Sequence, residues 1–200
     1  MARITARLAF ALALAMPVGL GSAVADGDKI FGLTKLHRIK VELSLAEWNV
    51  LQTSTPRGSS GGARGTNYSQ PDGRLIHIGG GFGGYFPWAH ADIRVCDLAL
   101  KNVGLRYKGN LSFSQSSAAA PLRASFKLKV DAYGARGSWD GEKTLNFAAG
   151  VVDTSGMREA IAFALFRAAG VPAPRTADAE LVFTVPGIYQ DTSAGLFTII

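Results

Sequence analysis

The sequence predicts an α+β fold, built as a mostly antiparallel sheet with one principal helix. Two patterns carry this prediction. Apolar and polar residues alternate in short runs over much of the chain, which is the period of a half-buried strand. One longer helical pattern, MREAIAFALFRAAGVPAPR over 157–175, interrupts these runs. The 200 residues are 48% hydrophobic and 18% charged, a composition typical of a globular protein.

The first 25 residues are typical of a signal peptide. Arg3 and Arg7 precede an apolar run over 10–20, and residues 23–25 (Ala-Val-Ala) form a small-x-small cleavage signal. We predict cleavage after Ala25 in a bacterial host. The product would be exported to the periplasm, the extracellular space or the cell surface, with no membrane contact. A signal anchor retained at the membrane is the alternative.

The charge and the cysteine content limit the possible partners. The formal net charge is +6 and becomes 6 − 2 = +4 without Arg3 and Arg7, because no Asp or Glu precedes residue 26. This mild excess fits phosphate-bearing or acidic partners and does not indicate nucleic-acid binding. Cys96 is the only cysteine, so no intrachain disulfide forms, and its apolar surroundings predict an inert core residue. Metal binding and intermolecular pairing are less favoured alternatives.

Residues 26–56 are expected to form an opening strand and a short helix. Polar and apolar residues alternate over 37–43, and the segment 44–47 (Ser-Leu-Ala-Glu) is a capping box that starts a helix. Residues 57–90 are expected to form a glycine-rich loop or insert, with a brief strand over 75–78. Glycines over 79–84 satisfy GxGxxG, but Pro and Trp follow instead of the helix that a dinucleotide site needs. We interpret that match as a by-product of glycine abundance.

Residues 91–200 contain the remaining strands. A serine-rich loop over 109–117 follows the second of them, and turns are predicted at 101–102 and before the last strand. The strand patterns lie at 92–98, 103–108, 125–130, 144–147, 181–185 and 195–200.

The helix predicted over 157–175 has clear ends and carries a glutamate close to an apolar side. Side-chain oxygens over 153–155 (Asp-Thr-Ser) precede it, and Gly170 allows a left-handed C-terminal residue before two prolines. Apolar residues occupy two opposite sides of the helix, which predicts that it is sandwiched between other elements. Glu159 projects from the second side, and a carboxylate near a buried face needs a cation. Lys127 and Lys129 share one face of the strand before the helix and are the candidate cations.

The order of these elements matches the small lobe of a protein kinase. There a flexible loop covers the ATP phosphates, a strand lysine contacts them, and a helix glutamate holds the lysine. A pair of surface lysines and an ordinary structural salt bridge would explain the same pattern. No Ser/His/Asp triad is indicated, and the three histidines (His37, His77, His90) lack metal-ligand spacing.

From residue 103 onward the chain resembles the spore coat protein H (CotH) kinases, which are secreted atypical protein kinases. The resemblance lies in VGLRYKGNLSFS (103–114), PLRASFKLKVD (121–131), LNF (145–147), MREAIAFALFRAAGVPAPRTA (157–177) and GLFTII (195–200). IKVELSLAEWNVLQ (39–52) is similar to the opening of the family domain. The glycine-rich insert is outside the common pattern.

The resemblance implies ATP-dependent phosphorylation of protein Ser/Thr hydroxyls, with ATP and Mg²⁺ as cofactors and a protein as substrate. Gly109, Asn110 and Ser112 would belong to the loop over the phosphates. Lys127 would contact the phosphates, with Lys129 as the second choice, and Glu159 would hold that lysine. Arg106, Lys108 and Arg158 occupy charged positions typical of the motif, without an assigned role.

The resemblance also predicts an incomplete enzyme. The apolar strand at 195–200 ends without a turn, so we expect a fragment, a small lobe truncated before the large lobe. The catalytic acids and the metal ligands are expected beyond Ile200, because Asp131 and Asp153 are interpreted as a strand-end residue and a helix cap. This fragment alone is expected to be inactive. A non-catalytic surface or coat protein that binds partners with the same fold is the alternative.

Overall fold

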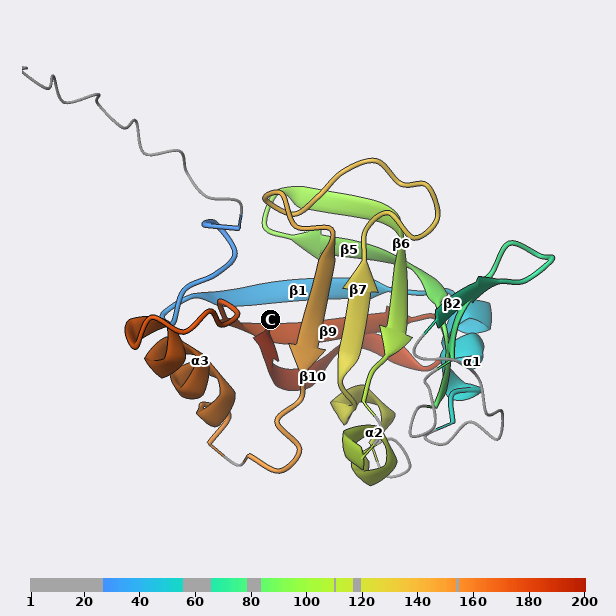
Figure 1. Ribbon diagram of the computed structural model, residues 1–200. Helices are drawn as coiled ribbons and strands as arrows, with labels where there is room; N and C mark the ends of the chain where they lie inside the picture. The colour runs from blue at the N-terminus through green and yellow to red at the C-terminus, as the bar shows by residue number, and fades with distance from the viewer. Residues whose placement is uncertain (1–26, 56–65, 79–83, 110, 117–119, 154) are drawn as a thin grey trace, which may run out of the picture.

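The structure is a computed structural model that describes residues 27–55, 66–78, 84–109, 111–116, 120–153 and 155–200. Seven strands close into a barrel in the order β1-β5-β6-β7-β8-β10-β9 (Figure 1). They are β1 (Leu36–Glu42), β5 (Ala89–Val95), β6 (Leu98–Tyr107), β7 (Phe126–Lys129), β8 (Thr144–Ala148), β9 (Ala177–Val185) and β10 (Tyr189–Ile199).

The predicted fold class is confirmed, because all neighbouring barrel strands are antiparallel except β1 and β9. The parallel pair joins the opening strand to β9, so the predicted segment 26–56 contributes a strand to the same barrel as residues 91–200. Closure of the sheet is a feature that the strand patterns do not reveal, since alternation fixes which face is apolar and leaves the partner open.

Aromatic side chains fill the barrel interior. The ring of Phe126 on β7 lies 5.0 Å from that of Tyr107, 5.3 Å from that of Phe183 and 6.1 Å from that of Phe197. All four are at most 1% exposed. These rings come from β6, β7, β9 and β10, so strands distant in sequence share one core.

The hairpin between β5 and β6 corrects two predictions. Val95 pairs with Leu98, so Cys96 and Asp97 form a two-residue turn in which Cys96 is exposed and has φ +49°. The expected core position of Cys96 is therefore wrong. The turn predicted at 101–102 is instead part of β6, where Asn102 has φ +54° beside a shift of register in the ladder.

A smaller sheet lies beside the barrel. Its strands are β2 (Thr66–Ser69), β3 (Leu75–Ile78) and β4 (Tyr85–Pro87), in the order β2-β3-β4. The brief strand predicted at 75–78 is confirmed as β3, and two neighbours were not predicted. The GxGxxG glycines at 79–83 lie outside the described residues.

Helix α1 (Leu45–Gln52) packs between the two sheets. Trp48 is 4% exposed and meets Phe183 and Tyr189 edge-on, with ring centres 6.4 and 5.2 Å apart. Half of the predicted capping box forms, since the Ser44 hydroxyl accepts a hydrogen bond from the Glu47 amide at 3.2 Å. The Glu47 carboxylate points elsewhere, toward Arg74.

Two short helical segments lie between β6 and β7, and the first replaces much of the serine-rich loop predicted over 109–117. They are α2 (Leu111–Ser116) and the 3₁₀ turn η1 (Pro121–Arg123). The helical turn is fixed by Phe113, which is 4% exposed and lies edge-on to Phe86 at 5.2 Å. A buried aromatic residue in the segment thus outweighed the loop preference of its serines.

Helix α3 (Arg158–Ala168) has the predicted ends. Asp153 Oδ2 accepts a hydrogen bond from the Arg158 amide at 2.8 Å, and Gly170 takes φ +77°. The Gly170 amide donates to the Arg167 carbonyl at 3.0 Å, and the next amide, of Val171, donates to the Phe166 carbonyl at 2.9 Å. This pair of bonds is a Schellman motif, which the glycine permits.

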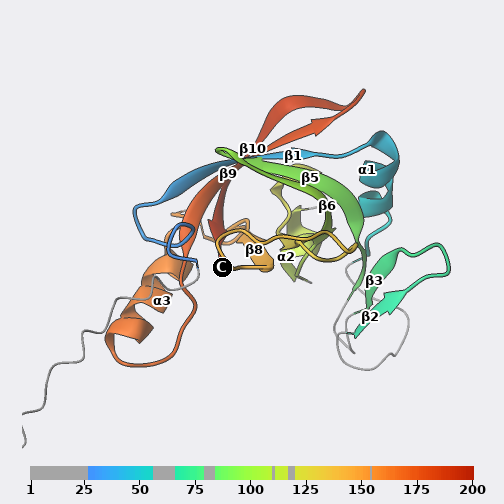
Figure 2. The same cartoon turned by 90° about the horizontal axis from the view of Figure 1, so that it is seen from above.

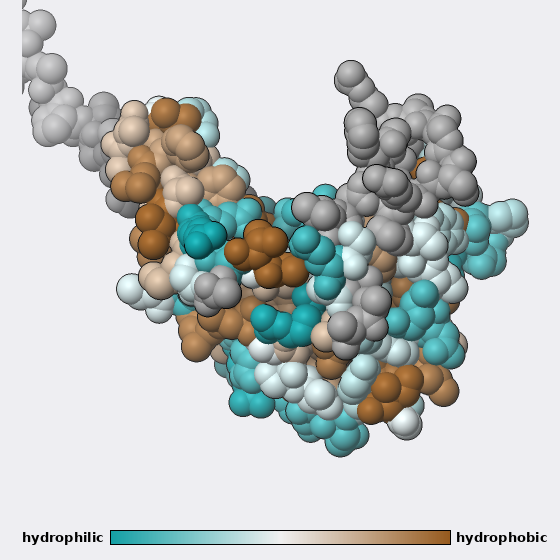
Figure 3. All heavy atoms as spheres, turned by 90° about the horizontal axis from the view of Figure 1, so that it is seen from below, coloured by the Kyte–Doolittle hydropathy of each residue, from teal (hydrophilic) through white to brown (hydrophobic). Residues whose placement is uncertain are grey.

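The predicted burial of α3 is wrong for the described structure. All eleven of its residues are at least partly exposed, and Leu165 and Phe166 are 64% and 50% exposed. Figure 3 shows the apolar side chains of this end of the molecule as brown surface, and Figure 2 shows α3 and the smaller sheet on opposite sides of the barrel. Apolar residues on two sides of a helix therefore do not show that other elements pack against those sides.

The predicted signal peptide lies outside the described residues, so its cleavage stays a prediction. Within the described ranges, no helix has the length and apolar content needed to cross a membrane.

Candidate functional site

A row of polar residues crosses the outer face of the barrel. Arg106 on β6 is directly opposite Lys127 on β7, and Lys127 is opposite Asn146 on β8. Asn146 in turn exchanges backbone hydrogen bonds of 2.8 and 2.9 Å with Ile200, just past β10. Directly opposed residues point to the same side of a sheet. This row, Arg106–Lys127–Asn146, therefore lies on one surface and leads to the end of β10.

The row is rich in cations that have no carboxylate partner. Lys127, Arg106 and the nearby Lys108 form no ion pair with any described residue. Lys129, the second-choice lysine, differs because its ammonium lies 3.1 Å from Asp131. This contrast favours Lys127 as the residue free to meet an external anion.

The surroundings of Lys127 disfavour its protonated, charged form. Burial lowers the pKa of Lys127, and the charges of Arg106, Lys108 and Lys129 lower it further. Burial likewise lowers the pKa of Lys108, partly offset by the charge of Glu159. An anion that binds among such crowded cations stabilises their charged forms and so raises their lowered pKa values.

Arg106 is the most buried charge of the row. Its side chain is 6% exposed, and burial lowers its pKa to about 10. The guanidinium carbon lies 4.9 Å from the ring of Trp88 and 5.9 Å from that of Phe86, and Nη1 donates to the Tyr107 carbonyl at 2.9 Å. Its Nε has no acceptor among the described residues. A buried donor without an acceptor is uncommon, so this unsatisfied Nε needs an explanation.

The predicted phosphate loop borders a cavity next to this row. Lys108, Gly109, Ser112 and Ser125 line a space of about 440 Å³. Gly109 has φ +90°, and a side chain there would collide with the Ser112 hydroxyl, so glycine is required. The structure thus brings Gly109 and Ser112 together beside Lys108. Asn110, the third predicted loop residue, lies outside the described residues.

A second cavity of about 360 Å³ continues toward α3. It shares Ala148, Gly150 and Val151 with the first, and Asp153 and Thr198 are among its other lining residues. The two cavities therefore run along the outer face of the sheet, from the Lys108 end to the beginning of α3.

The predicted pairing of Glu159 with Lys127 is not present as an ion pair in the structure. Glu159 is exposed, and none of the ion pairs among the described residues involves it. Its charge does act on Lys108, whose pKa it raises. Glu159 therefore influences Lys108 through its charge, and its contact with Lys127 stays a prediction.

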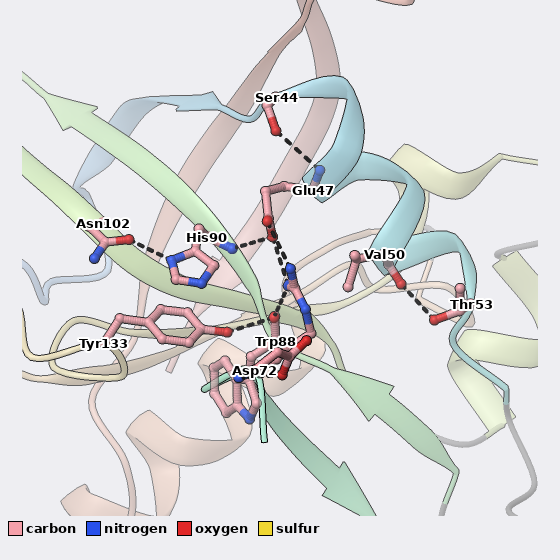
Figure 4. Close-up of polar contacts among 10 residues, drawn as sticks. Ser44, Glu47, Val50, Thr53, Asp72, Trp88, His90, Asn102 and Tyr133 are labelled. Carbon is pink, nitrogen blue, oxygen red and sulfur yellow. Dashed lines mark hydrogen bonds and ion pairs between the residues drawn. The ribbon is translucent and has the colours of Figure 1, made fainter. Parts of the chain in front are cut away.

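A polar network that sequence reasoning missed fixes the smaller sheet to the barrel (Figure 4). Glu47 receives two hydrogen bonds from Arg74, at 2.8 and 2.9 Å, and one from the His90 amide at 2.8 Å. Burial raises the pKa of Glu47, and the bonds from Arg74 and His90 outweigh it, so the pKa is lowered. Tyr133 stacks on the ring of His90 at 3.5 Å and donates to the Trp88 carbonyl at 2.6 Å.

Because Arg74 immediately precedes β3, this network holds β3 in place against α1 and β5. The sequence signal was an acid at the third helical position, which was interpreted only as half of a capping box. Its real partner lies 27 residues away.

The described residues offer no group of three or more His, Cys, Asp or Glu side chains positioned to hold a metal ion. The cations Lys127 and Lys108, unpaired among the described residues, are instead suited to an anion, whose oxygens would accept hydrogen bonds from them.

The fold and this cationic row define an α+β domain that is consistent with a kinase small lobe. The family model described as CotH kinase protein matches residues 105–197, and this match supports the assignment of the chain to that family. The predicted resemblance is thereby confirmed over β6 to β10. No curated protein matches the chain.

Proposed function

We propose that this chain is the nucleotide-binding part of an exported protein kinase of the CotH type, which transfers phosphate from ATP to Ser/Thr hydroxyls of a protein substrate. The CotH match over residues 105–197 supports a kinase-like function. The finer assignment rests on one observation of the structure. Lys127 stands between Arg106 and Asn146 on the outer sheet face, half-buried and without a carboxylate partner among the described residues.

The residues of this chain would bind and orient the phosphates. Lys127 would contact them, since an ammonium fixed by its strand is better positioned than a free one. Gly109 and Ser112 would cover them from the neighbouring loop and helix, beside Lys108. Glu159 would hold Lys127 once α3 approaches the sheet. These roles concern positioning and charge, which dominate catalysis of phosphoryl transfer.

The metal that such a reaction uses would neutralise charge on the phosphates. We propose no metal ligand among the described residues, because no acidic cluster suited to it occurs there. Those ligands, and the acid that orients the hydroxyl, are proposed to lie in other parts of the full-length protein.

The test is ATP-dependent autophosphorylation by the full-length protein. We expect Lys127→Ala to lower it about 100-fold, because a positioned charge at the transferred group is lost, while the protein stays folded. Lys143→Ala is the matched control, since this lysine is exposed, immediately precedes β8 and has its ammonium 3.8 Å from Asp131. Phosphate incorporation by the control should equal that of the parent protein.

Unchanged incorporation by Lys127→Ala would overturn the role of Lys127, and the same assay on Lys129→Ala would then test the second choice. ATP binding with no incorporation by the unaltered full-length protein would instead favour the non-catalytic binding protein.

Export is part of the same proposal. The apolar run and the Ala-Val-Ala segment support it. N-terminal sequencing of the protein recovered from its producing cells should give Asp26 as the first residue. A mature chain that begins at Met1 would contradict cleavage.

A further inference from the structure

One face of the smaller sheet is turned toward the cationic row. Asn67, His77 and Phe86 are directly opposite one another on β2, β3 and β4, so they share a face. The ring of Phe86 lies 5.9 Å from the guanidinium carbon of Arg106 and edge-on to Phe113 of α2. The face that carries His77 is therefore the face that packs toward β6 and α2.

His77 is half-buried on this face and held in one tautomer. Its Nδ1 lies 3.0 Å from the side-chain oxygen of Asn67, an acceptor, so Nδ1 carries the hydrogen and the neutral ring has a bare Nε2. Burial lowers the pKa of His77 to about 4, with further lowering by the charges of Arg106 on β6 and Lys127 on β7. The same two residues belong to the cationic row.

We propose that His77, Arg106 and Lys127 together bind one phosphate group of the nucleotide, with His77 taking up a proton from solvent on Nε2 as the phosphate binds. This inference rests on the proposed function, and it adds a residue from the smaller sheet to the site. Protonated His77 would then donate to a phosphate oxygen from Nε2 and to Asn67 from Nδ1.

Arg106 supplies the independent support for an anion at this place. Its side chain is more than nine-tenths buried, and its Nε has no acceptor among the described residues. Packing on Trp88 and Phe86 explains why the guanidinium is tolerated there, but it leaves that donor unsatisfied. A phosphate oxygen would satisfy Nε and would also counter the charges that lower the pKa values of Lys127 and His77.

The smaller sheet is a suitable support for such a contact. The Glu47–Arg74 pair and the Trp88 amide, which donates to the Leu75 carbonyl at 2.9 Å, hold β3 to the rest of the molecule. The sheet precedes residues 105–197, the part that matches the family model. His77 would thus be an addition by this chain to a site that the family segment otherwise forms.

The test is calorimetric binding of ATP to the full-length protein at pH 7.5 and pH 5.5, without added metal. If bound phosphate restores the pKa of His77 to its ordinary value of about 6.5, affinity should rise about tenfold more on acidification for the parent protein than for His77→Gln. The sign follows because binding takes up a proton. Comparing the two proteins removes the protonation of ATP itself, which they share.

His90→Gln is the matched control. His90 is also half-buried and also places Nδ1 against an asparagine oxygen, Asn102 at 2.6 Å, but its ring stacks on Tyr133 and its amide donates to Glu47. Its variant should keep the pH dependence of the parent protein. An NMR titration of His77 in the unaltered protein avoids any folding defect of a variant: its pKa should rise from about 4 toward 6.5 when tripolyphosphate is added.

The outcomes separate this inference from the proposed function. Equal pH dependence in the parent and His77→Gln proteins, with binding lost in Lys127→Ala, would overturn the role of His77 and leave the nucleotide site standing. Binding of tripolyphosphate but not ATP, with a His77-dependent gain at low pH, would overturn the nucleotide site and keep the anion site. Failure of both ligands to bind would overturn both.

Discussion

Helices α1 and α3 begin in the same way and end up in opposite environments. In each helix a side-chain oxygen accepts a hydrogen bond from a backbone N–H of the first turn. The oxygen belongs to Ser44 in α1 and to Asp153 in α3. Each has a glutamate in that turn, Glu47 and Glu159. Yet α1 buries Trp48 and Leu51, whereas every residue of α3 is at least partly exposed.

The difference shows that the residues that cap a helix do not determine what the helix packs against. Caps satisfy the free amides at a helix end and so fix where the helix begins. They carry no information on what the helix packs against, which depends on apolar partners supplied by other elements. Helix α1 finds Phe183 and Tyr189, and its glutamate finds Arg74. The described residues give α3 no comparable partners.

The largest expected effect tests the packing of the two helices. Trp48→Ala should lower the free energy of unfolding by about 3–5 kcal/mol, because it empties a buried aromatic site. Leu165→Ala on α3 should change it by less than about 0.5 kcal/mol, since that side chain is 64% exposed. Urea denaturation of both variants measures the two values. Similar losses in the two variants would mean that α3 is packed in solution and would end the contrast.

A smaller effect is expected for the two glutamates. Glu47→Gln should lower the free energy of unfolding by about 1–2 kcal/mol at pH 7, because a partly buried Arg74 loses its charged partner. Glu159→Gln should have almost no effect on stability, since Glu159 forms no ion pair with the described residues.

The pH dependence sharpens this comparison. The folded pKa of Glu47 is lowered, so its stabilisation is present above its unfolded value of about 4.3 and is lost as the pH falls through the folded pKa. The gap between the parent protein and Glu47→Gln should therefore close between about pH 5 and pH 3. A gap that persists at pH 3 would show that Glu47 contributes through packing and not through charge.

Most elements of the fold could be predicted from the sequence, because alternation and helix ends are local signals. The strands at β1, β3, β7, β8, β9 and β10 and both ends of α3 follow directly from them. The turn at Cys96 was missed because the apolar run continues through it. Helix α2 was missed because its serines hid one buried phenylalanine, Phe113.

The candidate site was predictable in its residue types and less so in its pairings. Lys127, Gly109 and Ser112 were named in advance, and the structure puts Gly109 and Ser112 on one cavity close to the strand of Lys127. The neighbours of Lys127 depend on register, which places Arg106 opposite it, and the charges of both residues lower the pKa of His77 on the smaller sheet. Alternation in a single strand does not specify register, so these neighbours required the structure.

The parallel pairing of β1 with β9 bears on the order in which the chain can fold. Leu36 pairs with Asp178, so the parallel partner of the first barrel strand is synthesised 178 − 36 = 142 residues later. Contacts between such distant segments are costly in loop entropy and fold slowly. Until β9 arrives, β1 has β5 as its only barrel partner among the described strands. The barrel therefore closes only after most of the chain has been made.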